Sequence, residues 1–363
     1  MKIGITIDLS LAFWANGVQQ NIVFLNHLFS SAPGNECCYI SESRLSDSIE
    51  SETEYVSPEQ IKESNIKFDV IIVAGLGLDD EIYDHLVKIN PDVKIVLIHC
   101  FNKLMDDMVF NIAYPDTNKI PAKTPKYLSE IWVLPHHEFS IEYIKSYYNF
   151  NKIKQAPYLW SPFFVNQKLH EMKQKGVSPL FKKGWENKVC IFEPNFSHIK
   201  NCLVPLMICE KFQNTFGDDL FSLNVFCCEK LRDNNFFKKF VSRLSIINKR
   251  ENFCFFNNRW STLAGLARWG STVVSHQMYN SLNYAHLETL YLGLPLIHNS
   301  EPLMNLGYYY PGFDIDMGAK QLKSAIINHD SCIDNYTKDA KDFIKKFDPK
   351  SSSNIKEYMD LLK

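Results

Sequence analysis

The sequence lacks the features that would place it in several large classes of protein. No apolar run reaches the ~18 residues of a membrane-spanning helix. The start, Met1-Lys2 followed by "IGITID", has the pattern of a strand rather than of a secretory signal. With a net charge of −2 over 363 residues, no overall positive field indicates a nucleic-acid-binding protein. We therefore expect a cytoplasmic protein without a membrane span, in which any contact with a polyanion depends on local patches.

Paired cysteine motifs are also missing. The ten cysteines are scattered, and the two close pairs, Cys37-Cys38 and Cys227-Cys228, are adjacent residues rather than CxxC. This spacing favours buried free thiols in a reducing compartment over disulfides or metal ligands.

The apolar residues of the first half of the chain form short Val- and Ile-rich runs that alternate with helical patterns. Near-continuous runs of this kind are typical of strands in a parallel sheet that is covered on both faces. They lie at residues 2–8, 68–77, 93–100 and 130–135. We expect one Rossmann-like domain over residues 1–165.

A second series of strand-like runs follows a polar, Lys-rich stretch. That stretch, residues 167–187, contains Gly and Pro and predicts a linker or an exposed loop. The runs lie at residues 188–194, 220–228, 252–257, 271–276 and 294–299. They predict a second Rossmann-like domain over residues 166–345. Residues 346–363 predict a C-terminal helix that is able to pack back on the first domain.

Two doubly wound α/β domains that face a cleft occur in dinucleotide-dependent dehydrogenases, periplasmic binding proteins and glycosyltransferases of the GT-B fold. The fingerprint of a dinucleotide site, GxGxxG, is absent after the first strand, where "DLSLAFWANGVQQN" contains the single glycine Gly17. A periplasmic protein requires an export signal. The remaining hypothesis is a nucleotide-sugar enzyme, so the expected fold is α/β of the GT-B type.

The segment "SLNYAHLETLYLGLPLIHNS", residues 281–300, places a carboxylate inside an apolar run. Residues 284–292 have helical spacing, and Glu288 lies one position off the apolar stripe. A carboxylate in this position is able to accept two hydroxyl hydrogen bonds, as from a ribose. An exposed helical Glu, or one paired with a neighbouring cation, is the other interpretation of the same pattern.

This segment resembles the donor-binding segment of GT-B glycosyltransferases, and it is especially similar to that of the T-even phage DNA α-glucosyltransferases. Their segment also has the form Ser-Leu-x-Tyr-x-His-Leu-Glu. The resemblance implies that Glu288 binds the ribose of UDP, with Tyr284 beside it. It further implies that Gly17 and Val18 lie in a loop near the donor phosphates. His99 ends a strand where that family carries a His-Asp pair, which makes it the candidate general base.

A second resemblance covers nearly the whole chain. The stretches "EIWVLP", "FEPNFSHIKNCLVP", "VVSHQMYNSLNY" and "LGYYYPGFDIDMGA" are similar to an uncharacterised family of bacterial and phage proteins. That family is regarded as glycosyltransferase-like and includes candidate arabinosyltransferases for phage DNA.

The chemistry of sugar transfer from a nucleotide requires groups that hold the departing diphosphate. "EPNFSHIKN" follows a strand, and GT-B enzymes often place an Arg and a Lys about five residues apart here. Lys200 matches the Lys, whereas Asn195 stands where the Arg would be, and His198 lies between them. A solvated Lys at the start of a helix is the alternative for Lys200.

Two further donor-site candidates end strands of the second domain. His276 ends the run "TVVSH", where it would face the cleft or form a satisfied core histidine. Asn257 lies in "FFNNRW", residues 255–260, where GT-B enzymes often bind the base; core packing is the alternative. Asp314-x-Asp316 predicts a capped turn rather than a metal site, so we expect no metal requirement and no permanently bound cofactor.

The candidate acceptor is DNA, on the strength of the phage resemblance. Lys119, Lys123 and Lys126 lie on a Pro-containing loop of the first domain, where they would contact phosphates or merely aid solubility. We expect transfer from a UDP-sugar, arabinose before glucose, to 5-hydroxymethylcytosine in double-stranded phage DNA, in the cytoplasm of the infected cell. The alternatives are an enzyme of lipopolysaccharide or capsule synthesis and a non-catalytic sugar-nucleotide-binding module. We expect a monomer.

Overall fold

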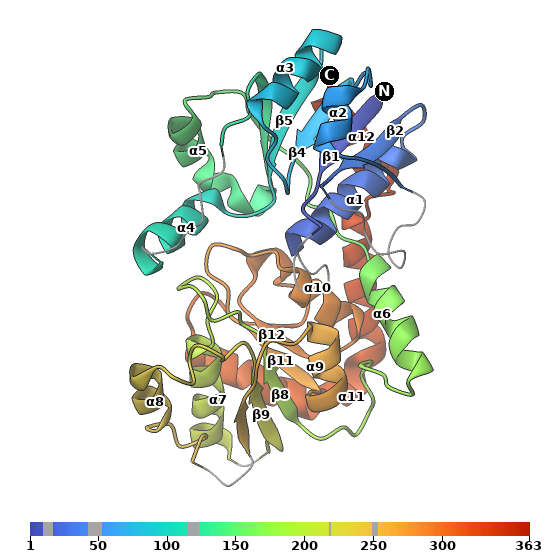
Figure 1. Cartoon of the computed structure of the whole chain (residues 1–363). Coiled ribbons are helices and arrows are strands. Elements are labelled where there is room, and N and C mark those ends of the chain that lie inside the picture. The colour runs from blue at the N-terminus through green and yellow to red at the C-terminus, as the bar shows by residue number, and fades with distance from the viewer. Residues whose placement is uncertain (10–16, 43–52, 115–122, 218, 249–252) are drawn as a thin grey trace. The chain divides into compact units, whose positions relative to one another are not determined.

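The structure, a computed structural model, describes residues 1–9, 17–42, 53–114, 123–217, 219–248 and 253–363. It divides into two compact units (Figure 1). The N-terminal domain comprises Met1–Ser161 together with Lys345–Lys363, and the C-terminal domain comprises Pro162–Ile344. Each domain contains one parallel sheet with helices on both faces, which confirms the predicted α/β class with two doubly wound domains. All ten cysteines are free thiols, as expected.

The sheet of the N-terminal domain has seven strands in the order β3-β2-β1-β4-β5-β6-β7. Their bounds are β1 (Lys2–Thr6), β2 (Glu36–Ile40), β3 (Glu54–Val56), β4 (Val70–Val73), β5 (Lys94–His99), β6 (Leu128–Val133) and β7 (Ile153–Gln155). The central strands are the Val- and Ile-rich runs of the sequence, and they are buried on both faces.

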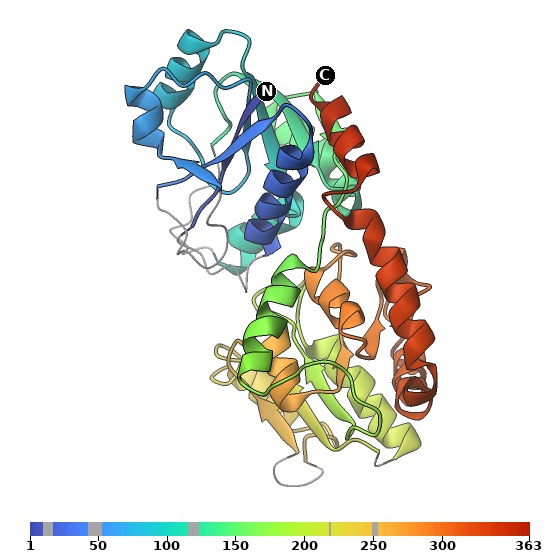
Figure 2. The ribbon, with the colours of Figure 1, turned by 90° about the vertical axis from the view of Figure 1, so that its right-hand side faces the viewer.

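Helices cover both faces of this sheet. Their bounds are α1 (Gly17–Ser31), α2 (Pro58–Glu63), α3 (Asp80–Ile89), α4 (Lys103–Met108), a π-helix η2 (Val109–Ala113), a 3₁₀ helix η3 (Pro135–Ser140), α5 (Ile141–Tyr148), a 3₁₀ helix η5 (Lys345–Phe347) and α12 (Ser352–Leu361). One core cluster packs α2, α3 and α5 on the strands. On the other face α12 lies beside α1 (Figure 2). There the ring of Tyr358 meets Phe29 at 5.8 Å and Trp132 at 5.7 Å between centroids.

The sheet of the C-terminal domain has six strands in the order β10-β9-β8-β11-β12-β13. The strands are β8 (Lys188–Ile191), β9 (Ser222–Val225), β10 (Cys254–Phe256), β11 (Thr272–Val274), β12 (Leu296–His298) and β13 (Tyr308–Tyr309). The helices are α6 (Phe163–Gln174), α7 (Leu203–Phe216), α8 (Asn235–Val241), α9 (Thr262–Trp269), α10 (Tyr284–Tyr291), a 3₁₀ helix η4 (Glu301–Leu303) and α11 (Ile315–Ile344).

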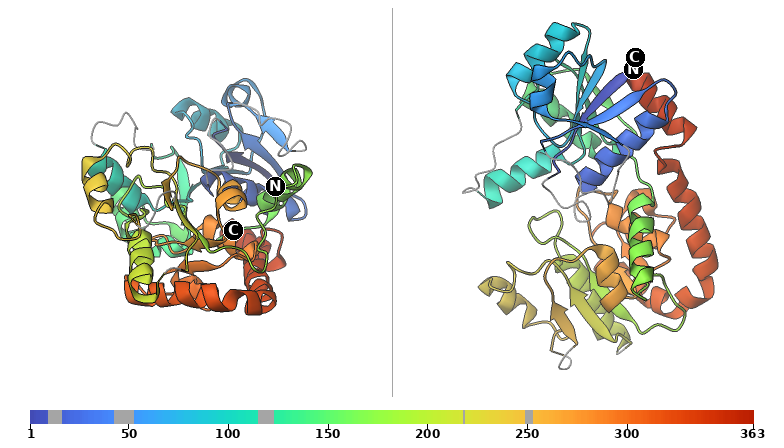
Figure 3. Two further views of the ribbon diagram at one scale, coloured as in Figure 1. Left: turned by 90° about the horizontal axis from the view of Figure 1, so that it is seen from below. Right: turned by 45° about the vertical axis from the view of Figure 1, so that its right-hand side comes forward.

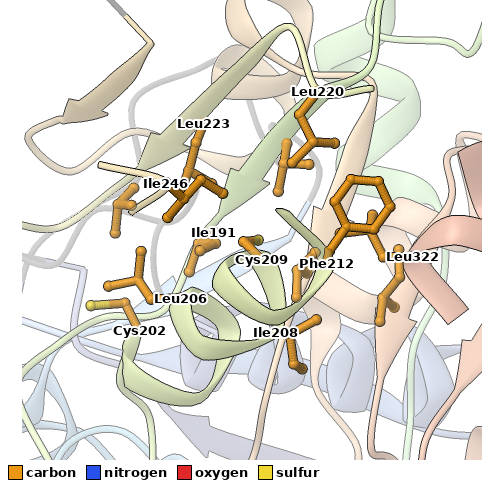
Figure 4. Close-up of a cluster of buried hydrophobic side chains, with 14 of the residues drawn as sticks. Ile191, Cys202, Leu206, Ile208, Cys209, Phe212, Leu220, Leu223, Ile246 and Leu322 are labelled. Carbon is orange, nitrogen blue, oxygen red and sulfur yellow. The ribbon is translucent and has the colours of Figure 1, made fainter. Parts of the chain in front are cut away.

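The core of this domain lies between the sheet and α7. Phe212 and Leu206 of α7 pack against Ile191 and Leu223 of the sheet, and Leu322 of α11 closes the cluster (Figure 4). On the opposite face α9 approaches closely at Gly265, because a Cβ atom there would lie 2.6 Å from the Phe192 ring. This close approach places the first turn of α9 next to the end of β8.

One prediction about the chain between the domains is wrong. Residues 167–174 belong to α6 rather than to a linker or an exposed loop. Phe164, Val165 and Met172 are the buried residues of this helix, and mostly polar residues lie between them. The segment therefore contains too few apolar residues at helical spacing to predict a helix. α6 lies beside α9 and α10 (Figure 3), and the hydroxyl of Tyr291 donates a hydrogen bond of 3.0 Å to Asn166.

Candidate functional site

The carboxyl ends of β8 and β11 are neighbours at the point where the strand order of the second sheet reverses. β8 pairs with β11, while β9 and β10 extend the sheet on one side and β12 and β13 on the other. In doubly wound sheets ligands bind outside such a switch point, because the loops of the two strands diverge there. We therefore centre the candidate site on the residues that follow these two strands.

Glu193 follows β8 and is only 2% exposed. Its carboxylate accepts hydrogen bonds from the hydroxyl of Ser275 (2.5 Å), the backbone N–H of His276 (3.2 Å) and the side-chain amide of Gln277 (2.7 Å). Burial raises the pKa of Glu193 to about 7, against the opposing effect of these hydrogen bonds and of Lys200. Near neutral pH, a small change in its surroundings therefore decides whether this group is charged.

Ser275 connects Glu193 to His286 of α10. Its Oγ lies 2.8 Å from Nε2 of His286, and both residues are buried. Burial lowers the pKa of His286 well below its ordinary value, and the electrostatic interactions with His298 and Lys200 lower it further. The ring is therefore neutral at pH 7. Its second nitrogen, Nδ1, is buried and has no hydrogen-bond partner in the described part of the chain.

His276 also presents an unused ring nitrogen. The hydroxyl of Tyr310 donates to the backbone carbonyl of Ser275 (2.9 Å), so Nδ1 of His276, 3.0 Å away, must donate to that hydroxyl. Nε2 is then a bare acceptor, and among the described residues it has no partner. Burial lowers the pKa of His276 to about 4. The ring of Phe313 lies 4.6 Å from it between centroids.

Lys200 is half-buried in the loop between β8 and α7, where its carbonyl accepts the N–H of Asn195 (3.2 Å). Within the described residues its ammonium group interacts electrostatically with Glu193 but has no hydrogen-bond acceptor or ion-pair partner. Burial lowers the pKa of Lys200, and Glu193 opposes this. A cation in this state attracts an anionic ligand, because a ligand charge would supply the partner that the protein does not.

Glu288 lies in the second turn of α10. The helix begins at Tyr284, which is buried, and the side chain of Asn283 caps it by accepting the N–H of Ala285 (3.1 Å). Glu288 is half-buried rather than exposed. Burial raises its pKa to about 7, and a hydrogen bond with the side chain of Thr262, at the start of α9, counteracts this. Most of the hydrogen-bonding capacity of this carboxylate is thus left for a ligand.

A small cavity connects these groups. Its wall includes Thr262 of α9, which bonds Glu288, and the Glu193–Ser275–His286 chain. The polar residues that line it are Glu193, Thr262, Ser275, Gln277, Asn283, His286 and Thr289. The buried Glu193 and the half-buried Glu288, both with a raised pKa, therefore border one polar region at the carboxyl edge of the sheet.

Three other predicted donor-site residues lie on loops at this edge. Asn195 has a left-handed backbone (φ 57°), and its side chain accepts the N–H of Cys202 (2.8 Å) and donates to the carbonyl of Phe226 (2.9 Å). It thus fixes the shape of the loop that carries Lys200. His198 is exposed. The backbone of Asn257 bonds the end of β9 and the loop after it: its N–H donates to the carbonyl of Val225 (2.7 Å), and its carbonyl accepts the N–H of Cys228 (2.9 Å).

The remaining predicted site residues belong to the N-terminal domain. His99 ends β5 and is 2% exposed, and its ring stacks on Tyr148 at 5.7 Å. Burial, together with the charge of Lys103, lowers the pKa of His99 to about 3. Its Nε2 is buried without a partner among the described residues. Gly17 and Val18 form the start of α1, and residues 10–16 before them lie outside the described part of the chain.

Two of the three lysines assigned to DNA have carboxylate partners within the domain. Lys123 pairs with Asp80 (2.6 Å) and Lys126 with Asp84 (2.6 Å), both on α3. Lys119 lies outside the described residues. A phosphate that bound Lys123 or Lys126 would therefore have to compete with an existing ion pair.

The described residues contain no group of three or more His, Cys, Asp or Glu side chains arranged to hold a metal ion. The Asp314-x-Asp316 pair has other partners. Asp314 caps α11 by accepting the N–H of Met317 (2.8 Å), as the sequence predicted, and Asp316 pairs with Lys211 (2.8 Å). In the part of the chain that the structure describes, no helix has the length and apolar character needed to cross a membrane.

Sequence reasoning missed Glu193, Ser275, Gln277 and His286. It selected His276 because that residue ends a strand, and the same criterion applied to β8 selects Glu193, which comes two residues after the strand. The hydrogen bonds of Glu193 with Ser275 and Gln277 join positions 82 and 84 apart in the sequence. No local sequence pattern predicts hydrogen bonds over such a separation.

The whole chain superimposes on glycosyltransferases with two Rossmann-like domains. It is similar to a glycosyltransferase from Rickettsia africae, with a TM-score of 0.59 and 10% identity over 99% of this chain and 97% of that one. It is also similar to HepE from Anabaena, solved in complex with UDP-glucose (TM-score 0.56, 10% identity, 100% and 99% of the chains). WaaG, a glycosyltransferase involved in lipopolysaccharide biosynthesis, gives a TM-score of 0.54 at 11% identity over 100% and 99%. The fold is therefore the GT-B fold that the sequence predicted.

The family follows from the sequence itself. Residues 3–362 match the model of a family described as "Protein of unknown function (DUF2827)", and the chain belongs to that family. No curated protein matches the sequence.

Proposed function

We propose that this protein is a glycosyltransferase that takes its sugar from a UDP-sugar bound at the carboxyl edge of the second sheet. The observation that carries this proposal is the pair of incompletely satisfied charges there. Lys200 is a cation without a bonding partner among the described residues, and Glu288 has one hydrogen bond, from Thr262. An anionic diphosphate and the two hydroxyls of a ribose are complementary to this pair.

The other residues of the edge complete the donor site in this proposal. Asn195 and His198 belong to the loop that presents Lys200, while Asn257 follows β10, where the base would lie against the backbone. His276 offers Nε2 as a hydrogen-bond acceptor, and Tyr284 begins the helix that carries Glu288. HepE, which shares the fold, was solved with UDP-glucose, and this supports UDP as the nucleotide.

The proposed chemistry requires stabilisation of a leaving group. When the bond from the sugar C1 to the diphosphate breaks, the transition state resembles an oxocarbenium ion and negative charge accumulates on the diphosphate. Lys200 supplies a fixed positive charge for that moment, in a partly buried site where charges interact strongly. The cation is part of the protein, so we propose a reaction that needs no bound metal.

We further propose that the acceptor is 5-hydroxymethylcytosine in phage DNA and that the sugar is arabinose, with glucose next. This part of the proposal rests on the resemblance of residues 281–288 to phage DNA glucosyltransferases and of the whole chain to candidate arabinosyltransferases. A base in a duplex would have to be flipped out to react, and the reaction would take place in the cytoplasm of the infected cell. His99 would orient the hydroxyl by accepting its hydrogen bond, because its pKa of about 3 makes it a poor store for the proton.

The test is a transfer assay with matched acceptors. The protein is incubated with UDP-arabinose or UDP-glucose and with two duplexes of one sequence, one hydroxymethylated and one with unmodified cytosine. Mass spectrometry of the nucleosides should show a pentose or hexose on hydroxymethylcytosine alone. Transfer to lipopolysaccharide fragments and none to DNA would replace the acceptor by a polysaccharide. Binding of UDP-sugars without transfer to any acceptor would identify a binding module instead of an enzyme.

A further inference from the structure

The proposed donor site contains a second buried charge that sugar transfer itself does not explain. Glu193 is 2% exposed, lies between the two strands of the switch point and interacts electrostatically with Lys200. The two side chains form no direct ion pair in the described residues, so the carboxylate compensates the ammonium charge without occupying its hydrogen bonds.

We propose that Glu193 is the internal counter-ion of Lys200 and that it is neutralised when the donor's diphosphate binds, so that donor binding takes up one proton on the Glu193 carboxylate. This inference rests on the proposed function, because it assumes a diphosphate at Lys200. The physical reason is charge balance. A diphosphate brings negative charge to a lysine that Glu193 already compensates, and the excess negative charge in a buried site favours protonation of the carboxylate.

The hydrogen bonds around Glu193 are able to accommodate both charge states. In the charged state the Ser275 hydroxyl donates to Glu193 over 2.5 Å, and Nε2–H of His286 donates to the same hydroxyl over 2.8 Å. In the neutral state Glu193 donates to Ser275, and Ser275 donates to a bare Nε2 of His286, whose proton then resides on Nδ1. Gln277 continues to donate to the second carboxyl oxygen, 2.7 Å away, in both states.

The groups around Glu193 leave it as the one poised to change charge. Lys200 faces it from the loop after β8, and Tyr310 and the thiols of Cys202 and Cys227 also interact with it. Burial raises the pKa values of the tyrosine and the two thiols, so these groups stay neutral at pH 7.

The neighbouring histidines are neutral as well. Burial lowers the pKa of His276 and His298 to about 4 and that of His286 well below its ordinary value. Glu193, with a pKa of about 7, is therefore the acidic group next to Lys200 that a nearby charge is able to switch in the physiological range.

The test is calorimetric titration of the protein with UDP-glucose at pH 7.5 in buffers of different ionisation enthalpy. The dependence of the observed enthalpy on the buffer gives the number of protons taken up. UDP-glucose is a suitable probe because its diphosphate has no group that titrates near pH 7. The free Glu193 carboxyl group is about three-quarters ionised at pH 7.5, and Glu288, with a pKa of about 7 as well, releases about a quarter of a proton when the ribose hydroxyls hold it in the charged form. Wild-type binding should therefore take up roughly half a proton.

Three variants give the contrast. Glu193→Gln keeps the shape of the side chain and should abolish the uptake. Glu210→Gln is the matched control, because Glu210 is another buried, hydrogen-bonded carboxylate of the same domain that lies against Ser245 and Ile246 instead of Lys200. It should leave the uptake unchanged. Ser275→Ala removes one donor from the charged form, so its uptake should reach its maximum at higher pH than in the wild type.

The outcomes separate this inference from the proposed function. Binding of UDP-glucose without proton uptake, or equal uptake in Glu193→Gln, overturns the role of Glu193 while the donor site stands. If proton uptake persists in Glu193→Gln and disappears in Lys200→Met, the proton binds to the lysine, and this result also overturns the role of Glu193. If Glu193→Gln does not fold, the test is Ser275→Ala: a pH dependence of proton uptake equal to that of the wild type would overturn the role of Glu193. A wild-type protein that fails to bind UDP-glucose refutes the proposed donor instead.

Discussion

Replacing Glu288 by Gln should stabilise the protein without ligand while it weakens UDP binding. Glu288 is half-buried, and burial raises its pKa from an ordinary 4.5 to about 7. That change corresponds to about 3 kcal/mol against the ionised form. A glutamine removes the charge, and its amide oxygen is still able to accept the hydrogen bond from Thr262.

The sign and the pH range follow from proton binding. The folded protein holds the Glu288 proton more tightly than the unfolded chain does, so ionisation opposes folding as the pH rises. The cost is absent below pH 4.5, increases between pH 4.5 and 7, and is constant above. At pH 8 the variant should therefore gain up to about 3 kcal/mol, or roughly 6–12 °C in the melting temperature of a domain of this size. At pH 4.5 the two proteins should melt together.

The assay is a series of thermal melts of wild type and variant from pH 4.5 to 8, with UDP titrations at pH 8. Buried histidines such as His276 also titrate in this range, but they contribute equally to both proteins and cancel in the difference. UDP affinity should fall by about 1.5–3 kcal/mol, the range for hydrogen bonds to a charged group.

Glu210→Gln provides a control of opposite sign. Burial alone would raise the pKa of Glu210, but hydrogen bonds from the backbone N–H groups of Ile246 and Ser245 lower it, so the loss of its charge should destabilise the domain at pH 8. A Glu288→Gln protein that is no more stable than wild type at pH 8 would refute the reasoning. So would a stability difference that does not change with pH, because it would indicate packing rather than charge.

Further predictions concern individual residues. Lys200→Ala should mainly lower turnover, because the cation acts on the departing diphosphate; normal turnover would place it outside the site. His99→Ala should reduce transfer while UDP affinity stays unchanged, and full activity would exclude His99. Alanine at both Lys123 and Lys126 should lower the log–log salt slope of DNA binding by about 0.9 per lost phosphate contact; an unchanged slope would leave these lysines to their ion pairs with α3. Asp314→Ala should cost about 1 kcal/mol in denaturant titrations by removing the cap of α11, and a serine should restore it.

The central strands could be predicted because they are continuous apolar runs. β4, β5, β8 and β12 all lie inside the predicted runs, and β6 begins two residues before its run, at Leu128. A strand that is buried on both faces forms a continuous apolar run, which is easily recognised in a sequence. Three edge strands were not predicted. β3 and β7 contain three residues each and β13 only two. The fourth edge strand, β10, lies inside the predicted run 252–257.

The candidate site was predictable where one segment carries the information. Residues 281–300 contain a cap, a helix, a carboxylate and the following strand, so Glu288 could be selected from the sequence alone. Glu193 depends on partners from a strand more than eighty residues away, and no local pattern contains them. The ion pairs of Lys123 and Lys126 with α3 span more than forty residues. The local sequence does not contain their partners, and for this reason the lysines were predicted to be available for phosphates.

The position of α12 has a consequence for how the protein is made. The chain leaves the N-terminal domain after Ser161 and returns to it at Lys345, so a ribosome completes the entire C-terminal domain before it supplies α12. Until then the rings of Phe29 and Trp132 lack Tyr358, and the carbonyl of Pro157 lacks the hydroxyl that lies 2.7 Å away in the finished structure. The domain that is synthesised first is thus completed last, and until α12 is made the apolar residues that α12 covers lack their final packing partner.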